Sequence, residues 1–131
     1  MQQEKDYLQR DIERISLFLK ILLRKVVGLN NEDFQPECSQ LEKDLQEQVD
    51  FSMQELSQLD EVGLKDKIAP LHLAHIDKLV EIAFEILKKS NPENKEKICR
   101  NILFMIEHLN KESDTFSLQR IQIKEELEKH L

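Results

Sequence analysis

The apolar positions of the chain recur at helical spacing along most of its length. The most regular stripe lies in the first thirty residues, with spacings of four and three in alternation: Leu8, Ile12, Ile15, Leu19, Leu22, Val26 and Leu29. A heptad-like stripe of this kind predicts one long amphipathic helix, which we place at residues 3–27, ended by Gly28. Further apolar residues widen the stripe: Phe18, Ile21, Leu23 and Val27. A stripe this broad needs covering on more than one side.

Turn signals divide the rest of the chain into further helices. We expect a thinner helix from about Pro36 to Asp60, a short turn at 64–69, helices at 71–89 and 92–110, and a last helix capped by Asp114 and Thr115 and carrying Phe116. Asn91 and Pro92 are a cap and a first helical residue. Short connections predict that the last three helices are antiparallel neighbours. The expectation is one all-α domain over residues 1–131 of about five helices, with a helical hairpin at 1–60 and antiparallel pairs at 71–131.

Composition and charge agree with this fold class and exclude one class of partner. Glycine (2) and proline (3) are scarce, and straight-chain residues that favour helices dominate. The net charge is −7, and residues 30–70 hold eleven Asp/Glu against three Lys/Arg. Such a chain lacks the basic stripe that binds phosphate backbones, so nucleic acid is not an expected partner. The acidic segment could attract a basic partner, although an ordinary solvated surface explains it as well.

The cysteines and the apolar stretches indicate a cytoplasmic protein. Cys38 and Cys99 are far apart in sequence, form no paired motif and are expected to be buried free thiols, as in a reducing compartment. The first residues are polar and mixed in charge, unlike a signal peptide. The longest apolar stretch, Leu17 to Leu29, is interrupted by three basic residues and is too short to span a bilayer.

Two resemblances extend this prediction. Residues of the last helices are similar to the tetratricopeptide pattern, with Leu79, Ile82, Ala83 and Ile86 on a first helix and Cys99, Leu103 and Ile106 on a second. Both small positions of the second helix are replaced, and the loop needs about four extra residues. The whole chain, with the segment Lys5-Asp6-Tyr7-Leu8-Gln9-Arg10-Asp11-Ile12-Glu13, resembles an uncharacterised family of small bacterial α-helical proteins with a tetratricopeptide-like C-terminal half. This resemblance implies a fold and a bacterial origin, but no mechanism.

Candidate chemistry is sparse. His72 and His75 are three residues apart at the start of a predicted helix, a spacing that can present two imidazoles to one metal ion, but two ligands do not make a site. The sequence shows no His-Glu-x-x-His motif, no glycine-rich phosphate loop and no nucleophile elbow. We therefore expect no catalytic residues and no cofactor.

A contact surface is the remaining candidate site. Tyr7, Arg10 and Arg14 fall at a spacing suited to one face of the first helix, and Phe18 continues it. These four residues are the candidates for binding a partner. The alternative is that Tyr7 packs at the edge of the stripe while the arginines pair with nearby acidic residues of the same helix.

These observations favour a non-catalytic helical protein-interaction module whose C-terminal helices offer a groove to a protein or peptide. The broad first helix could be covered by this chain, pair with a second copy in a homodimer, or lie on a membrane surface, and we favour them in that order. The rival prediction is a ligand- or metal-binding helical bundle, or an enzyme, with a site that the sequence does not reveal.

Overall fold

The computed structural model describes residues 2–90, 92–114 and 117–131 and, within them, side chains from residue 5 on. The regular elements of this part are seven α-helices: α1 (Gln2–Gly28), α2 (Asn31–Val49), α3 (Met53–Gln58), α4 (Glu61–Ile68), α5 (Leu73–Ser90), α6 (Lys95–Glu112) and α7 (Leu118–Glu128). The all-α prediction is confirmed, whereas the expected five helices become seven. Asn91, Thr115 and Phe116, to which the sequence assigned capping and packing roles, lie outside the described residues.

The largest difference from the sequence prediction lies between residues 30 and 60. Asn30 caps α2 well before the predicted start at Pro36, because its side-chain oxygen accepts a hydrogen bond from the amide of Asp33 (2.9 Å). Pro36 therefore lies inside α2 and not in its first turn. The expected long helix also ends early, at Asp50, which adopts a left-handed conformation with φ 54°.

A new helix starts directly after this break. Ser52 caps α3 by accepting a hydrogen bond from the amide of Glu55 (3.1 Å), in the Ser-x-x-Glu sequence of a capping box. Asp60 caps α4 in the same way through the amide of Gly63 (2.7 Å). The short turn expected at 64–69 is thus the C-terminal half of a helix that begins at Glu61.

The last three helices begin later than predicted. α5 starts at Leu73 and α6 at Lys95, each two or three residues beyond the predicted start. α7 starts at Leu118, because Ser117, and not the predicted Asp114, accepts the capping hydrogen bond from the amide of Arg120.

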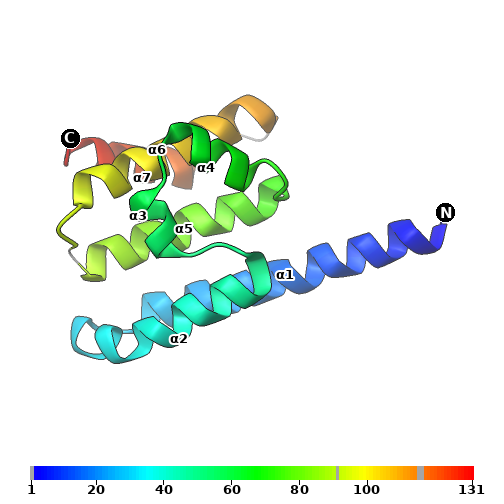
Figure 1. Ribbon diagram of the computed structural model, residues 1–131, viewed down its shortest axis with the longest axis horizontal. Helices are drawn as coiled ribbons and strands as arrows, with labels where there is room; N and C mark the ends of the chain where they lie inside the picture. The colour runs from blue at the N-terminus through cyan, green and yellow to red at the C-terminus, as the bar shows by residue number, and fades with distance from the viewer. Residues whose placement is uncertain (1, 91, 115–116) are drawn as a thin grey trace.

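Helices α1, α5 and α7 run in the same direction, side by side. His75 at the start of α5 contacts Ile12 of α1, and Lys89 at its end contacts Val26. The starts of α5 and α7 also lie together, because Arg120 near the start of α7 forms an ion pair with Asp77 near the start of α5 (3.4 Å). Helices α2 and α6 run back in the opposite direction, and α3 and α4 pack on α6 (Figure 1).

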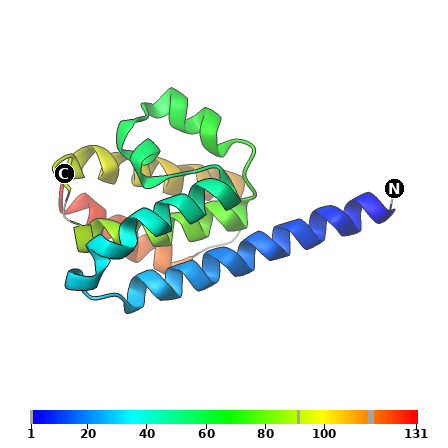
Figure 2. The same cartoon turned by 60° about the horizontal axis from the view of Figure 1, so that its bottom comes forward.

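Helix α5 lies at the centre of the fold. It packs against α1, α2 and α6 and buries nine of its residues. The heptad-like stripe of α1 faces this chain's own core: Leu19, Leu22 and Val26 are buried, and Ile15 packs against them. The first turns of α1 project beyond the other helices (Figure 2), so Leu8 remains 64% exposed although it lies on the same stripe.

One side chain fixes the end of α1 to α5. The Lys89 ammonium donates hydrogen bonds to the carbonyl oxygens of Val26, Val27 (2.9 Å) and Leu29. The last carbonyls of a helix have no partner within it and carry the negative end of its dipole. Lys89 therefore caps α1 from the neighbouring helix and sets the position of one helix along the other.

Candidate functional site

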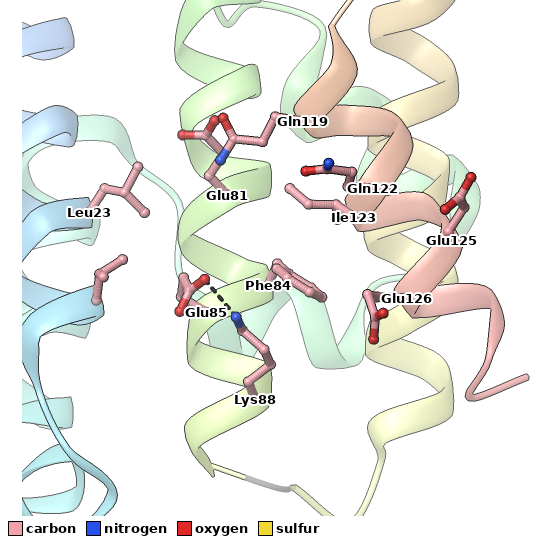
Figure 3. A pocket seen from close by; sticks show the side chains of 11 residues that line it. Leu23, Glu81, Phe84, Glu85, Lys88, Gln119, Gln122, Ile123, Glu125 and Glu126 are labelled. Carbon is pink, nitrogen blue, oxygen red and sulfur yellow. Dashed lines mark ion pairs between the residues drawn. The ribbon is translucent and has the colours of Figure 1, made fainter.

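A groove with a volume of about 500 Å³ lies between α1 and α7, over α5 (Figure 3). It is lined by Leu23 and Val27 of α1, by Glu81, Phe84, Glu85 and Lys88 of α5, and by Gln119, Gln122, Ile123, Glu125 and Glu126 of α7. We call this the α1–α5–α7 groove. Three parallel helices from the two ends and the middle of the chain form it, so it exists only in the folded protein.

Both apolar side chains and acidic groups line the groove. Phe84 of α5 and Ile123 of α7 point toward each other, and Leu23 extends from α1 on the other side of α5 (Figure 3). Four glutamates against one lysine give the lining a net negative charge. An apolar surface bordered by carboxylates suits an amphipathic segment that carries basic residues.

The charged side chains of the groove are already ordered. Lys88 is paired with Glu85 (2.8 Å) and lies over the ring of Phe84, 4.6 Å from its centroid, a cation–π contact. Glu81 is buried, with its carboxylate bonded to Lys78 (3.1 Å). Glu81 and Glu85 are thus already paired with lysines of α5, so the exposed Glu125 and Glu126 of α7 are the carboxylates that a basic partner reaches first.

At the outer edge, Glu126 remains ionised in mildly acidic solution. A hydrogen bond from Lys129, followed by the positive charge of that residue, lowers the pKa of the Glu126 carboxyl from its ordinary value. Its carboxylate therefore stays ionised at pH values where an unpaired glutamate begins to take up a proton, and Lys129 holds it in place at 2.9 Å.

The predicted contact residues of α1 lie elsewhere. Tyr7, Arg10 and Arg14 line a separate depression of about 230 Å³, together with Asp11. Phe18 is not part of it and packs, half-buried, against the core. The Arg14 guanidinium donates hydrogen bonds to Asp11 (2.9 Å) and to Gln48 of α2 (2.6 Å), so at least this arginine has the intrahelical acidic partner that the alternative reading predicts.

The two candidate metal ligands have other partners. The Nε2 atom of His75 lies 3.0 Å from the carbonyl oxygen of Ile12 and 3.1 Å from the Ser16 hydroxyl. Nδ1 of His72 accepts a hydrogen bond from the Ala74 amide (3.1 Å). The rings lie 5.4 Å apart at an angle of 50°. No group of three or more His, Cys, Asp or Glu residues converges in residues 2–90, 92–114 and 117–131, so the pair gains no further ligand there.

The surroundings of the two cysteines are those of packing residues and not of reactive thiols. Both are free thiols; Cys99 is buried as expected, whereas Cys38 is only half-buried and lines a smaller apolar cavity of about 220 Å³ with Met53 and Ile98. Burial raises the pKa of both thiols above their ordinary value, with a smaller contribution from Glu42 at Cys38. Neither environment activates a nucleophile, which needs a lowered thiol pKa.

Sequence reasoning missed the groove although it expected one on the C-terminal helices. One signal was present: Phe84 and Lys88 lie four residues apart, beside the apolar stripe of α5 and not on it. An aromatic residue off the core stripe indicates a second apolar face. The contribution of α1 could not be foreseen, because helical periodicity does not identify the neighbouring helix.

Comparisons of the chain with protein-family models, curated proteins and solved structures found no match. Among the described residues, no helix has both the length and the apolar character needed to cross a membrane.

Proposed function

We propose that this protein is a non-catalytic interaction module that binds an amphipathic, basic helical segment of a partner protein in the α1–α5–α7 groove. The observation that carries the proposal is the composition of this groove, in which an apolar floor is bordered by the half-buried Glu85 and the exposed Glu125 and Glu126. In such recognition, the apolar face of the incoming helix supplies most of the affinity, and the charges select the partner and its orientation.

The direction of the helices supports tetratricopeptide-like stacking as the architecture of this module. Helices α1, α5 and α7 run parallel and form one face, and α2 and α6 run in the opposite direction behind it, with the short helices α3 and α4 inserted between α2 and α5 (Figure 1). Stacked helix pairs of this kind create elongated concave surfaces that bind peptides. We place the module in a bacterial cytoplasm, which the family resemblance and the two free thiols favour.

A defined peptide tests the proposal. The probe is a fluorescent helical peptide with leucines on one face and lysines on the other, and its binding to the protein is followed by fluorescence anisotropy. The peptide should bind, and a counterpart with glutamates in place of the lysines should bind at least about tenfold more weakly, because like charges oppose docking.

Matched variants locate the binding. Glu125→Lys/Glu126→Lys reverses two exposed charges of the groove, and Glu47→Lys/Glu107→Lys makes the same change at exposed positions of α2 and α6. The proposal requires that only the groove variant lose affinity for the lysine peptide. Equal losses in both variants, or equal binding of the two peptides, would show that net charge and not the groove determines binding.

A further inference from the structure

The outer side of α1 carries an exposed face that complements the groove. Leu17, Lys20, Ile21 and Arg24 form it and are all exposed; we call these four residues the outer ridge. Leu17 and Ile21 are more than half exposed, at 58% and 56%. Five of the eight large apolar residues that are exposed in the described chain belong to α1: Tyr7, Leu8, Leu17, Ile21 and Val27.

The charge of this face is opposite to that of the groove. The sequence contains no Asp or Glu between residues 14 and 31, although the whole chain carries a net charge of −7. Arg14, Lys20, Arg24 and Lys25 make this segment the most basic stretch of the protein. Lys25 is held by Glu37 of α2 (3.4 Å), whereas Lys20 and Arg24 have no ion-pair partner among the described residues.

We propose that the outer ridge of one copy docks in the α1–α5–α7 groove of a second copy, so that the protein is a reciprocal homodimer. This inference rests on the proposed function, since the ridge is itself a basic, partly apolar helical segment. Lys20 and Arg24 would meet the groove glutamates, while Leu17 and Ile21 reach its apolar floor.

The position of α1 makes the contact reciprocal. The same helix forms one wall of the groove, through Leu23 and Val27, and carries the ridge on its outer side. A two-fold axis on the groove side of α1, at Leu23 and away from the ridge, sets the second α1 antiparallel to the first along residues 18–27 and turns each ridge toward the groove of the other copy. Because α1 and α5 run parallel and the end of α5 meets residues 26–29 of α1, this stretch lies beside the groove. Each ridge–groove contact then occurs twice, as in an isologous dimer.

The proposed dimer contact uses another face of α1 than the heptad-like stripe that the sequence analysis considered for a homodimer. From Ile15 on, the heptad-like stripe packs in this chain's own core, so this part of it is not available to a second copy. Direct ridge-to-ridge packing would bring arginines and lysines together, which like-charge repulsion disfavours. Docking of the ridge in an acidic groove avoids this repulsion.

Charge exchange between two variants tests the dimer by sedimentation equilibrium. The ridge variant is Lys20→Glu/Arg24→Glu and the groove variant is Glu125→Lys/Glu126→Lys. The wild-type protein should dimerise, more strongly at low salt than at high salt. Each variant alone should dimerise more than about tenfold more weakly, whereas an equal mixture should form a heterodimer because both contacts again join opposite charges. Lys43→Glu/Lys65→Glu, at exposed positions of α2 and α4, should dimerise as the wild type does.

Three results would overturn the inference. These are a wild-type protein that is monomeric at all concentrations, a ridge variant that dimerises as the wild type does, or a mixture that fails to associate. Binding of the ridge to vesicles containing phosphatidylserine, without dimerisation in solution, would identify a membrane surface as the occupant instead.

Binding of the lysine peptide distinguishes failure of the dimer proposal from failure of the proposed function. The ridge variant keeps its groove glutamates, so it should bind the peptide at least as tightly as the wild type. A monomeric wild type that binds the peptide refutes the dimer and leaves the proposed function standing. A protein that neither dimerises nor binds the peptide refutes both.

Discussion

Lys89 shows how a single polar side chain sets the relation between two helices. Its ammonium donates hydrogen bonds to three carbonyl oxygens at the end of α1, those of Val26, Val27 and Leu29. The aliphatic part of the side chain bridges α5 and α1. Both helices contribute to the groove, so the shape of the groove depends on this contact.

Replacing Lys89 by methionine should destabilise the protein. The substitution keeps the apolar stem and removes the charged donor from three helix-end carbonyls, of which only that of Val26 has the amide of Leu29 (3.3 Å) as a further backbone donor among the described residues. Hydrogen bonds to charged groups contribute about 1.5–3 kcal/mol, and we expect the free energy of unfolding in urea to fall by an amount in this range. Lys43→Met, at an exposed position of α2, should change it by less than about 0.5 kcal/mol. Equal effects of the two substitutions would contradict the capping role.

The two cysteines should alkylate slowly and in a fixed order. Burial raises the pKa of both thiols, so at neutral pH less of each is present as the reactive thiolate than in the unfolded chain. With iodoacetamide, followed by mass spectrometry, we expect Cys38 to react before Cys99, because Cys38 is half-buried and Cys99 is fully buried.

The sign of the pH effect follows from these shifts. A raised thiol pKa means that the folded protein binds the proton more tightly, so alkylation of the folded state should accelerate at a higher pH than alkylation of the urea-unfolded chain. Reaction of Cys38 at the rate of an unfolded thiol at neutral pH would contradict the description of its surroundings.

At the scale of elements, side chains at the start of α6 and before it hold α3, and Asn101 is the buried one among them, with Asn94 and Lys97 bonding to the carbonyl oxygens of Ser57 and Gln58. A helix of six residues cannot be stable alone. The Asn101 amide, buried in α6, donates hydrogen bonds to the carbonyl oxygens of Leu56 (2.6 Å) and Leu59 (3.0 Å). These two bonds hold the end of α3 against α6 and lead the chain into α4.

Asn101→Ala should loosen α3 and α4 selectively. The substitution leaves two carbonyl groups without their donor, at a cost of about 1–3 kcal/mol. In hydrogen–deuterium exchange, we expect the amides of α3 and α4 to exchange faster while those of α5 keep their protection. Asn110→Ala in the same helix is the control, since Asn110 is exposed and bonds to Arg120 of α7. Faster exchange throughout the protein would show that Asn101 supports the whole fold and not this contact.

The elements differ in how well the sequence predicts them. The bounds of α1 are predicted to within about one residue, because its stripe is long and regular and Gly28 ends it. The single helix predicted at 36–60 is wrong, because Pro36 lies inside α2 and Asp50 ends that helix in a left-handed conformation, which helical spacing does not reveal. The Ser52-x-x-Glu55 capping box was a readable signal for the new start, and the helical spacing of the leucines on both sides concealed it.

The candidate site was less predictable than the elements. Periodicity identifies the apolar face of each helix, but the groove joins residues that are about a hundred positions apart in sequence. Tyr7, Arg10 and Arg14 were recognisable as a surface because they are close in sequence. The glutamates of the groove look like ordinary solvated residues until α5 and α7 are placed side by side.

At the scale of the whole molecule, the fold separates charge. The outer ridge of α1 is basic, and the groove on the other side of the same helix is acidic. The parallel course of α1, α5 and α7 places the apolar floor between them. This arrangement offers a partner helix an apolar contact and opposite charge together, which is the basis of the proposed function.

Mapping of the lysine peptide by NMR tests this account most directly. The protein is labelled with nitrogen-15, used as the monomeric ridge variant and titrated with the unlabelled peptide. We predict that amide shifts concentrate at residues 23–27, 81–88 and 119–126, where three separate helices line one groove. Shifts concentrated at Tyr7, Arg10 and Arg14, or around Cys38, would contradict the account, as would the absence of shifts at peptide excess.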